Sequence, residues 1–147
     1  MAEASGATSE SVRTGKALWI EMRTPDGSAW QGLAKAITVP GSKGSMGVLP
    51  RHAPLMSSMD VGLAKVTAED GSVSRWVTGA GFVEVFQNKV LLLADFADAT
   101  GEIDRVRAEK AKERAQARLR EGGEQVDTAR AEAALNRAAV RLQYASV

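Results

Sequence analysis

The chain is 147 residues long, which allows one ordinary domain or a small domain with an appendage. Its formal net charge of +1 excludes strong charge-driven binding of nucleic acid or anionic membrane by the molecule as a whole. The absence of cysteine excludes disulfide frameworks and thiolate metal sites, and the best apolar run, Val90 to Ala94, is only long enough for a strand.

Residues 1–15 are expected to be a disordered N-terminal extension. They carry Glu3 and Glu10 and have no apolar stretch of the kind found in secretion signals. Composition then changes near residue 100, because all four prolines precede it and the remainder is dominated by alanine, arginine and glutamate. Residues 16–100 and 101–147 are therefore expected to form two different architectures.

Residues 16–100 are predicted to form strands. Short stretches either alternate apolar and polar residues or form apolar runs, with turn signals such as Pro25-Asp26-Gly27 between them. The expected strands are Ala17–Thr24, Gly32–Val39, Gly62–Ala68, Val73–Gly79, Gly81–Gln87 and Lys89–Asp95. Many short strands without helical pattern between them indicate an antiparallel β-sandwich or barrel.

The stretch GVLPRHAPL, Gly47 to Leu55, contains the only histidine of the chain. His52 could serve as the base of a Ser-His-Asp arrangement, but a single histidine without cysteine cannot form the usual zinc sets. The prolines on either side, Pro50 and Pro54, fix φ and favour a structural corner. The corner is the favoured interpretation.

Residues 101–147 are predicted to form two helices, Glu102–Arg120 and Val126–Ala145, both rich in strong helix formers. The stretch EGGEQ between them supplies glycines where the first helix must end, and Asp127 is placed to cap the second. The short connection predicts an antiparallel hairpin, whose apolar stripe is mostly alanine and therefore buries little surface.

Arginines of this hairpin repeat at helical spacing. Arg107 and Arg114 share a face of the first helix, and Arg137 and Arg141 are an i,i+4 pair of like charges on the second. Converging guanidinium groups could hold a polyphosphate, with Asp104 close to a base amino group. Spacing alone favours a solvated charged face, in which neighbouring glutamates screen the cations.

Several strings occur in order along the chain: VPGSKGSMGVLPRHAPL, GAGFVEV, VLLLAD, EIDRVRA and RAEAALNRAAVRL. In this order and spacing the chain resembles the epsilon subunit family of F-type ATP synthases, called delta in mitochondria. The resemblance runs from about Lys16 over nearly the whole chain. It implies a ten-stranded β-sandwich followed by a helical hairpin, in agreement with the α+β class expected from the residues: an N-terminal antiparallel β-sandwich and a C-terminal two-helix antiparallel hairpin.

The resemblance implies a mechanical and non-catalytic function. Members of the family help to fix the central stalk to the membrane rotor, so that proton-driven rotation stays coupled to ATP synthesis. The implied partners are the gamma subunit, the c-ring and, when the hairpin extends, the alpha and beta subunits of the catalytic head, where the hairpin inhibits ATP hydrolysis. The implied location is the cytoplasmic face of the bacterial inner membrane.

The resemblance also implies which residues contact the neighbouring subunits. Contact with the rotor ring or the stalk is expected at Lys43, Ser45, Met46, Pro50, His52 and Pro54. The family often has acidic residues in the loop that meets the ring, whereas this chain has Lys43 and Ser45 there. No metal and no required cofactor is implied.

ATP is implied as a regulatory ligand. The I/L-D-x-x-R-A motif of ATP-binding members is matched by Ile103, Asp104, Arg107 and Ala108, and their additional arginines by Arg114, Arg137 and Arg141. With the resemblance, this set is the expected ATP site, and bound ATP is expected to hold the hairpin folded.

Two other functions remain as alternatives. The first is a nucleic-acid-binding β-module with a basic helical arm, against which the near-neutral charge and the scattered tryptophans count. The second is a small hydrolase that uses His52.

Overall fold

The computed structural model describes residues 10–145. The chain divides between Ala97 and Asp98 into two compact units. This division lies a few residues before the expected boundary at 100/101, because Asp98 is bonded to the second helix of the hairpin. None of the helices within residues 10–145 is long and apolar enough to cross a membrane.

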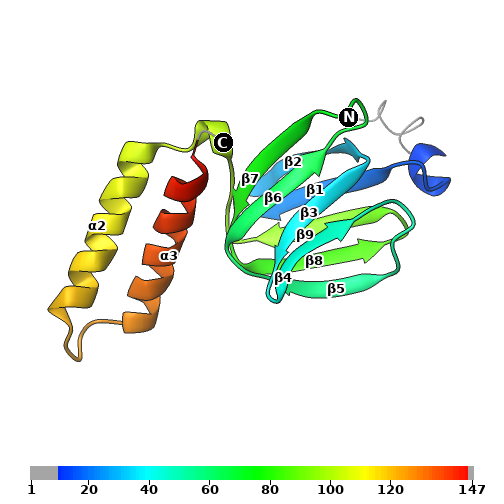
Figure 1. Ribbon diagram of the computed structural model, residues 1–147. Helices are drawn as coiled ribbons and strands as arrows, with labels where there is room; N and C mark the ends of the chain where they lie inside the picture. The colour runs from blue at the N-terminus through cyan, green and yellow to red at the C-terminus, as the bar shows by residue number, and fades with distance from the viewer. Residues whose placement is uncertain (1–9, 146–147) are drawn as a thin grey trace. The chain divides into compact units, whose positions relative to one another are not determined.

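The first unit is a β-sandwich built from one continuous sheet (Figure 1). The strands of the sheet are β1 (Leu18–Thr24), β2 (Gly27–Ala34), β3 (Ala36–Gly41), β4 (Gly44–Val48), β5 (Leu55–Met59), β6 (Gly62–Thr67), β7 (Val73–Thr78), β8 (Gly81–Phe86), β9 (Lys89–Ala94) and β10 (Ala97–Ala99), of which β10 spans the boundary between the two units. The strand order is β10-β7-β6-β3-β5-β8-β9-β1-β2, and β4 pairs with β3. The predicted sandwich and its ten strands are confirmed.

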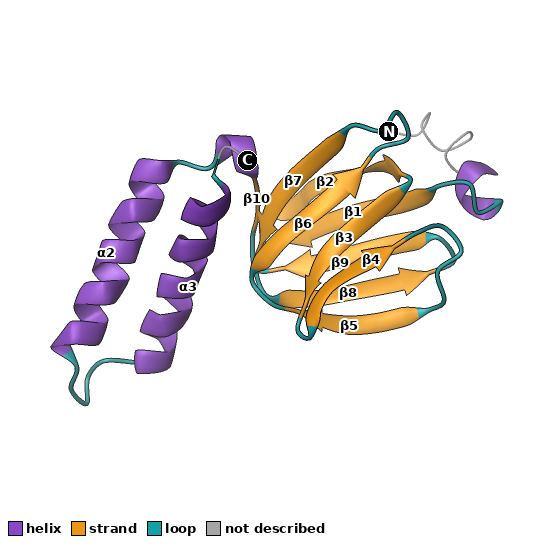
Figure 2. Ribbon diagram, in the orientation of Figure 1, coloured by secondary structure: helices purple, strands orange, loops and turns teal. Residues whose placement is uncertain are grey.

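Neighbouring strands are mostly antiparallel, as predicted, but β1 runs parallel to β9. A parallel pair needs a long connection, and the chain from β1 to β9 provides one. The sheet folds over on itself in two layers, which Figure 2 shows in orange. Every second residue of β1, namely Leu18, Ile20 and Met22, is buried in the core between these layers.

Three strands, β4, β5 and β10, were missing from the prediction, and one predicted strand is divided. The segments β4 and β5 are rich in glycine and serine, which favour strands weakly, and they are held in the sheet by pairing with β3 and β8. The stretch predicted as Gly32–Val39 contains the end of β2 and the start of β3, which are separated at Lys35.

The β6–β7 turn is closed by a side chain. The Asp70 carboxylate accepts hydrogen bonds from the Ser72 hydroxyl, at 2.6 Å, and from the Ser72 backbone N–H, at 2.8 Å. These bonds stabilise the charged carboxylate and so hold the pKa of Asp70 below its ordinary value.

The N-terminal extension is not disordered throughout. Residues 10–13 form a helical turn, in which the Thr14 N–H donates to the Glu10 carbonyl at 2.9 Å. Val12 is only 5% exposed, and its carbonyl accepts a hydrogen bond from the Asn88 side chain. This apolar anchor orders residues 10–15, contrary to the expectation for 1–15, whereas residues 1–9 lie outside the described part.

The second unit contains a short 3-10 turn, η1 (Thr100–Glu102), and two helices, α2 (Arg105–Glu121) and α3 (Thr128–Tyr144). The predicted hairpin of two helices is confirmed (Figure 2). Helix α2 begins after its predicted start because Asp104 caps it, and Glu102 belongs to η1. The helices pack through small side chains, and the buried ones on their facing sides are Ala108, Ala115, Ala131 and Ala138.

Candidate functional site

The outer face of the β5-β8-β9 strands carries an apolar groove, lined by Met56, Phe82, Glu84, Leu91 and Leu93. The strand register brings these side chains together, because Leu91 lies opposite Glu84 and Leu93 opposite Phe82. Met56 and Phe82 are 70% and 58% exposed. Apolar side chains gathered on an exposed face are typical of a surface that binds another protein.

This groove was not predicted from the sequence. A signal was present in β8, GFVEVF, where Val83 and Val85 face the core while Phe82 and Phe86 lie on the other side. Large apolar residues on both faces of an antiparallel strand indicate that its outer face is also covered. We name the groove residues Met56, Phe82, Leu91 and Leu93 the outer patch.

The residues expected to contact the rotor do not form one surface. Lys43 and Ser45 lie at the tip of the β3–β4 hairpin, whereas Pro50, His52 and Pro54 lie in the loop after β4. These two groups lie at opposite ends of β4, about 16 Å apart for a strand of this length. Met46, between them, packs against the core.

His52 belongs to a tight corner. Its backbone N–H donates to the Leu49 carbonyl at 3.1 Å, and its Nδ1 atom lies 2.7 Å from the Ala53 carbonyl oxygen. The preceding residue, Arg51, has a left-handed φ of 70°. The imidazole therefore ties down the backbone of the loop, as the corner interpretation requires. Within residues 10–145, His, Asp and Glu form no cluster of three that could hold a metal ion.

The hairpin motif has local structural roles. The Asp104 carboxylate accepts a hydrogen bond from the Arg107 N–H at 3.0 Å, which is the N-cap of α2. Ala108 is buried between the helices, where only a small side chain fits, and Ile103 is half-buried just before the cap.

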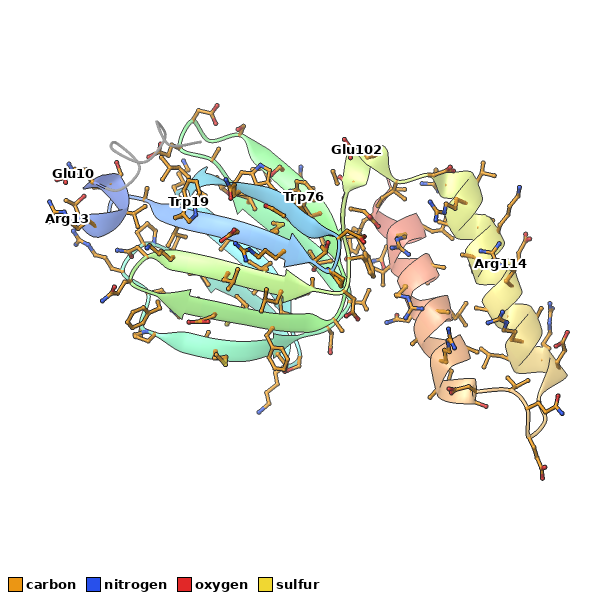
Figure 3. The ribbon with its side chains drawn as sticks, turned by 180° about the vertical axis from the view of Figure 1, so that it is seen from behind. Glu10, Arg13, Trp19, Trp76, Glu102 and Arg114 are labelled. Carbon is orange, nitrogen blue, oxygen red and sulfur yellow. The ribbon has the colours of Figure 1, made fainter. Side chains whose placement is uncertain are left out.

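The arginines share one flank of the hairpin. Arg107 and Arg114 each precede a buried alanine of α2 by one residue, and Arg137 precedes the buried Ala138 of α3. In two antiparallel helices, positions one residue before the facing residue lie on the same side. Arg107 and Arg114 are exposed, whereas Arg137 and Arg141 are half-buried (Arg114 is labelled in Figure 3).

At the open end of the hairpin, Asp98 and Arg105 form bonds that were not predicted from the sequence. The Nε atom of Arg141 donates to the Oδ2 atom of Asp98 at 2.7 Å. Arg105 donates from Nη1 to the Ala145 carbonyl at 3.5 Å. Only the position of Asp98 shortly before the motif could have suggested a role for it.

Comparisons with known proteins cover both units. The beta-sandwich domain of the ATP synthase delta/epsilon chain matches residues 17–100, and the long alpha-helix domain of the same chain matches residues 102–146. Helix α2 and helix α3 lie within the second match.

Curated relatives are epsilon chains. The ATP synthase epsilon chain of Desulfitobacterium hafniense (strain Y51) is 45% identical over 101 residues, which are 67% of this chain and 76% of the relative. That of Desulforudis audaxviator is 43% identical over 100 residues, 68% of this chain and 72% of the relative.

Solved structures of mitochondrial ATP synthases contain chains with a similar fold. A chain of the Euglena gracilis mitochondrial ATP synthase is 27% identical, with a TM-score of 0.73 over 84% of this chain and 78% of that one. A chain of the Tetrahymena thermophila enzyme has the same fold, with a TM-score of 0.56 over 86% of this chain and 92% of that one, at 18% identity. This chain therefore belongs to the ATP synthase delta/epsilon chain family, whose members are non-catalytic subunits.

Proposed function

We propose that the chain is a subunit of the central stalk of an F-type ATP synthase, where it couples proton-driven rotation to ATP synthesis. The single observation that carries this proposal is the outer patch on a sandwich domain of this family. The Euglena structure with which the chain aligns contains F1 and a c-ring, which supports these neighbours. A nucleic-acid module and a hydrolase that uses His52 receive no support from the family matches, which cover both units.

The outer patch is the proposed docking surface for the gamma subunit. Phe82 and Met56 are large and exposed, as anchors of a protein interface are, and they occupy diagonal positions of the β5–β8 pair, where Met56 is opposite Glu84 and Phe82 is opposite Ser58. The exposed Glu84 adds one negative charge beside the outer patch. The partner surface is therefore expected to be apolar with a basic residue opposite Glu84.

This docking is tested by measuring how tightly the Phe82→Ser variant binds to an ATP synthase complex. The complex is first depleted of the small stalk subunit that it normally contains. Binding is expected to weaken about tenfold or more, since anchors of this kind contribute about 2 kcal/mol or more to an interface. Val73→Ser on β7 is the matched control, because Val73 is also an exposed apolar residue, at 42%. Equal binding of Phe82→Ser and the wild-type chain contradicts the assignment.

Contact with the c-ring is assigned to the tip of the β3–β4 hairpin. Lys43 is exposed at this tip, beside the Ser42 and Ser58 hydroxyls, which are hydrogen-bonded to each other at 2.9 Å. A basic and hydroxyl-rich tip favours a ring loop with carboxylate or carbonyl oxygens. Ser45 lies at the same tip. The corner with Pro50, His52 and Pro54 lies at the other end of β4, so this corner is assigned to the stalk side instead.

The hairpin is proposed to bind ATP through the motif residues and the arginine flank. Arg107, Arg114 and Arg137 lie on one side of the hairpin, and Arg141 lies near the same end as the motif. Their guanidinium groups would hold the phosphates, and bound ATP would hold the helices together. When the hairpin opens, the helices extend toward the alpha and beta subunits and inhibit ATP hydrolysis.

The ATP proposal is tested by calorimetric titration of the full chain with ATP, with and without magnesium. Arg137→Ala is expected to weaken binding about tenfold or more, because a charged hydrogen bond contributes about 1.5–3 kcal/mol. Lys112→Ala is the matched control, because Lys112 lies five residues after Arg107 and two before Arg114, on a different side of α2 from both arginines. The absence of saturable binding up to millimolar ATP contradicts the proposal and leaves the stalk role untouched.

The proposed location is the cytoplasmic face of a bacterial inner membrane, as a peripheral part of the membrane-bound complex. The bacterial sources of the relatives, such as Desulfitobacterium hafniense and Desulforudis audaxviator, support it.

A further inference from the structure

Residues 10–16, which we name the N-terminal turn, have a shape that their own sequence determines. The helical turn ends at Gly15, which has a left-handed φ of 73°. The Gly15 N–H donates to the Val12 carbonyl at 3.2 Å, and the next N–H, that of Lys16, donates to the Ser11 carbonyl at 2.9 Å. These two bonds around a left-handed glycine form a Schellman motif, which ends helices in a regular way. The N-terminal turn is therefore an ordered element.

The N-terminal turn contacts two segments that are distant in the sequence, at one end of the sandwich (Figure 3). Val12 is buried, and its carbonyl accepts a hydrogen bond from the Asn88 side chain of the β8–β9 turn at 2.9 Å. The Arg51 side chain lies so close to Gly15 that a Cβ atom there would be 2.8 Å from the Arg51 Nε atom. Asn88 also accepts a hydrogen bond from the Arg51 N–H at 2.6 Å. The N-terminal turn, the corner (residues 49–54) and the β8–β9 turn therefore form one surface.

This surface carries an excess of positive charge. The N-terminal turn contributes Arg13 and Lys16, the corner contributes Arg51, and the start of β9 contributes Lys89, and all four are exposed. Among the described residues of these segments the one carboxylate is Glu10, which pairs with Arg13 at 2.9 Å. We name the four cations the basic end.

The basic end continues the outer patch. Phe86 is 51% exposed and lies on the same face of β8 as Phe82, about 13 Å further along the strand. Lys89 lies opposite Phe86 in the β8–β9 pair. A protein that covers the outer patch and extends along β8 therefore reaches the basic end, where a complementary surface is negatively charged.

We propose that the basic end binds an acidic segment of the gamma subunit, so that the N-terminal turn is an additional docking element. This inference rests on the proposed docking of the outer patch to gamma. The N-terminal turn lies outside residues 17–100, which match the sandwich domain of the family. The β3–β4 tip assigned to the ring lies at the other end of β4 from the corner, which favours a protein over lipid headgroups as the partner of the basic end. With Glu84 beside the outer patch and cations beyond Phe86, the charges favour one direction of the partner segment.

Association of the full chain with a soluble head and stalk tests this proposal. The soluble complex is first depleted of its own small stalk subunit and contains neither ring nor lipid. Lys16→Glu and Lys89→Glu are each expected to slow association about fivefold at low ionic strength. Glu10→Gln, which removes the carboxylate, is expected to speed association about twofold, a gain that a damaged fold would not produce. Lys65→Glu, the same charge change at an exposed residue in the middle of β6, is the matched control and is expected to associate as the wild-type chain does.

In about 1 M salt, where the screening length falls to about 3 Å, all these variants are expected to associate at the wild-type rate. Equal association of Lys16→Glu and Lys65→Glu at low ionic strength overturns the proposal. A loss that occurs only with membrane vesicles carrying the complete complex also overturns it, because the cations would then face lipid headgroups or the ring. If Phe82→Ser loses binding while the charge variants keep it, docking through the outer patch stands and the basic end fails. If the wild-type chain does not bind, both fail.

Discussion

Asn88 connects three segments that are distant in the sequence. Its Nδ2 atom donates to the Val12 carbonyl at 2.9 Å, and its Oδ1 atom accepts from the Arg51 N–H at 2.6 Å. It adopts a left-handed φ of 63°, which asparagine tolerates well in a two-residue hairpin turn. One side chain of the β8–β9 turn thereby holds both the N-terminal turn and the corner that contains His52.

Thr78 places a hydroxyl group in the core without a hydrogen bond within the described residues. It is 0% exposed, and within the described residues its hydroxyl Oγ1 has no hydrogen-bond partner. Because a buried polar group without a bond costs free energy, the isosteric Thr78→Val is expected to raise the free energy of unfolding by about 1–2 kcal/mol.

Urea denaturation of the full chain measures this effect. Thr38→Val on β3, which is half-buried, is the control and is expected to change stability much less. A less stable Thr78→Val variant would mean that the hydroxyl is bonded in solution, and the assignment would be wrong.

At the level of elements, variants at the start of α2 test whether Asp104 stabilises this helix as its N-cap. The carboxylate caps the helix through the Arg107 N–H, so Asp104→Ala is expected to destabilise the hairpin by about 1 kcal/mol. Asp104→Asn is expected to remain close to the wild-type chain, because asparagine caps equally well.

Thermal melting followed by helical circular dichroism measures both variants. Asp127→Ala, which removes the equivalent cap of α3, gives the reference loss. If Asp104→Asn melts as early as Asp104→Ala, the charge rather than the cap stabilises the helix.

The helices were easier to predict than the strands, for a physical reason. Strong helix formers, capping aspartates and paired glycines are local signals, and they placed α2 and α3 to within a few residues. The segments β4 and β5 are strands only because β3 and β8 pair with them, and no local signal marks such pairing. The outer patch could not be predicted from local signals either, because its side chains are brought together only by the register of three strands.

For the candidate site, sequence motifs indicated residues but not their partners. The motif from Ile103 to Ala108 was visible as a string, whereas the pair between Asp98 and Arg141 depends on how the hairpin closes. The rotor-contact residues were adjacent in sequence, yet β4 separates Lys43 from His52. Residues that are close in the sequence can therefore lie far apart in space when a strand separates them, because an extended chain covers about 3.3 Å per residue.

On the scale of the whole molecule, the two units differ in what stabilises them. The sandwich has a continuous apolar core contributed by both of its layers. The hairpin relies on alanine contacts, two aspartate caps and the Asp98–Arg141 pair. This difference in stability suits the proposed function, in which the sandwich stays bound while the hairpin changes conformation.

Proton pumping shows whether the chain couples rotation to catalysis by docking through the outer patch. Membrane vesicles that carry an ATP synthase depleted of its own small stalk subunit receive the wild-type chain, Phe82→Ser or Val73→Ser, and proton uptake is measured per ATP hydrolysed. The wild-type chain and Val73→Ser are expected to restore pumping, whereas Phe82→Ser is not at the same concentration. Full restoration by Phe82→Ser, or equal pumping without any added chain, is incompatible with coupling through the outer patch.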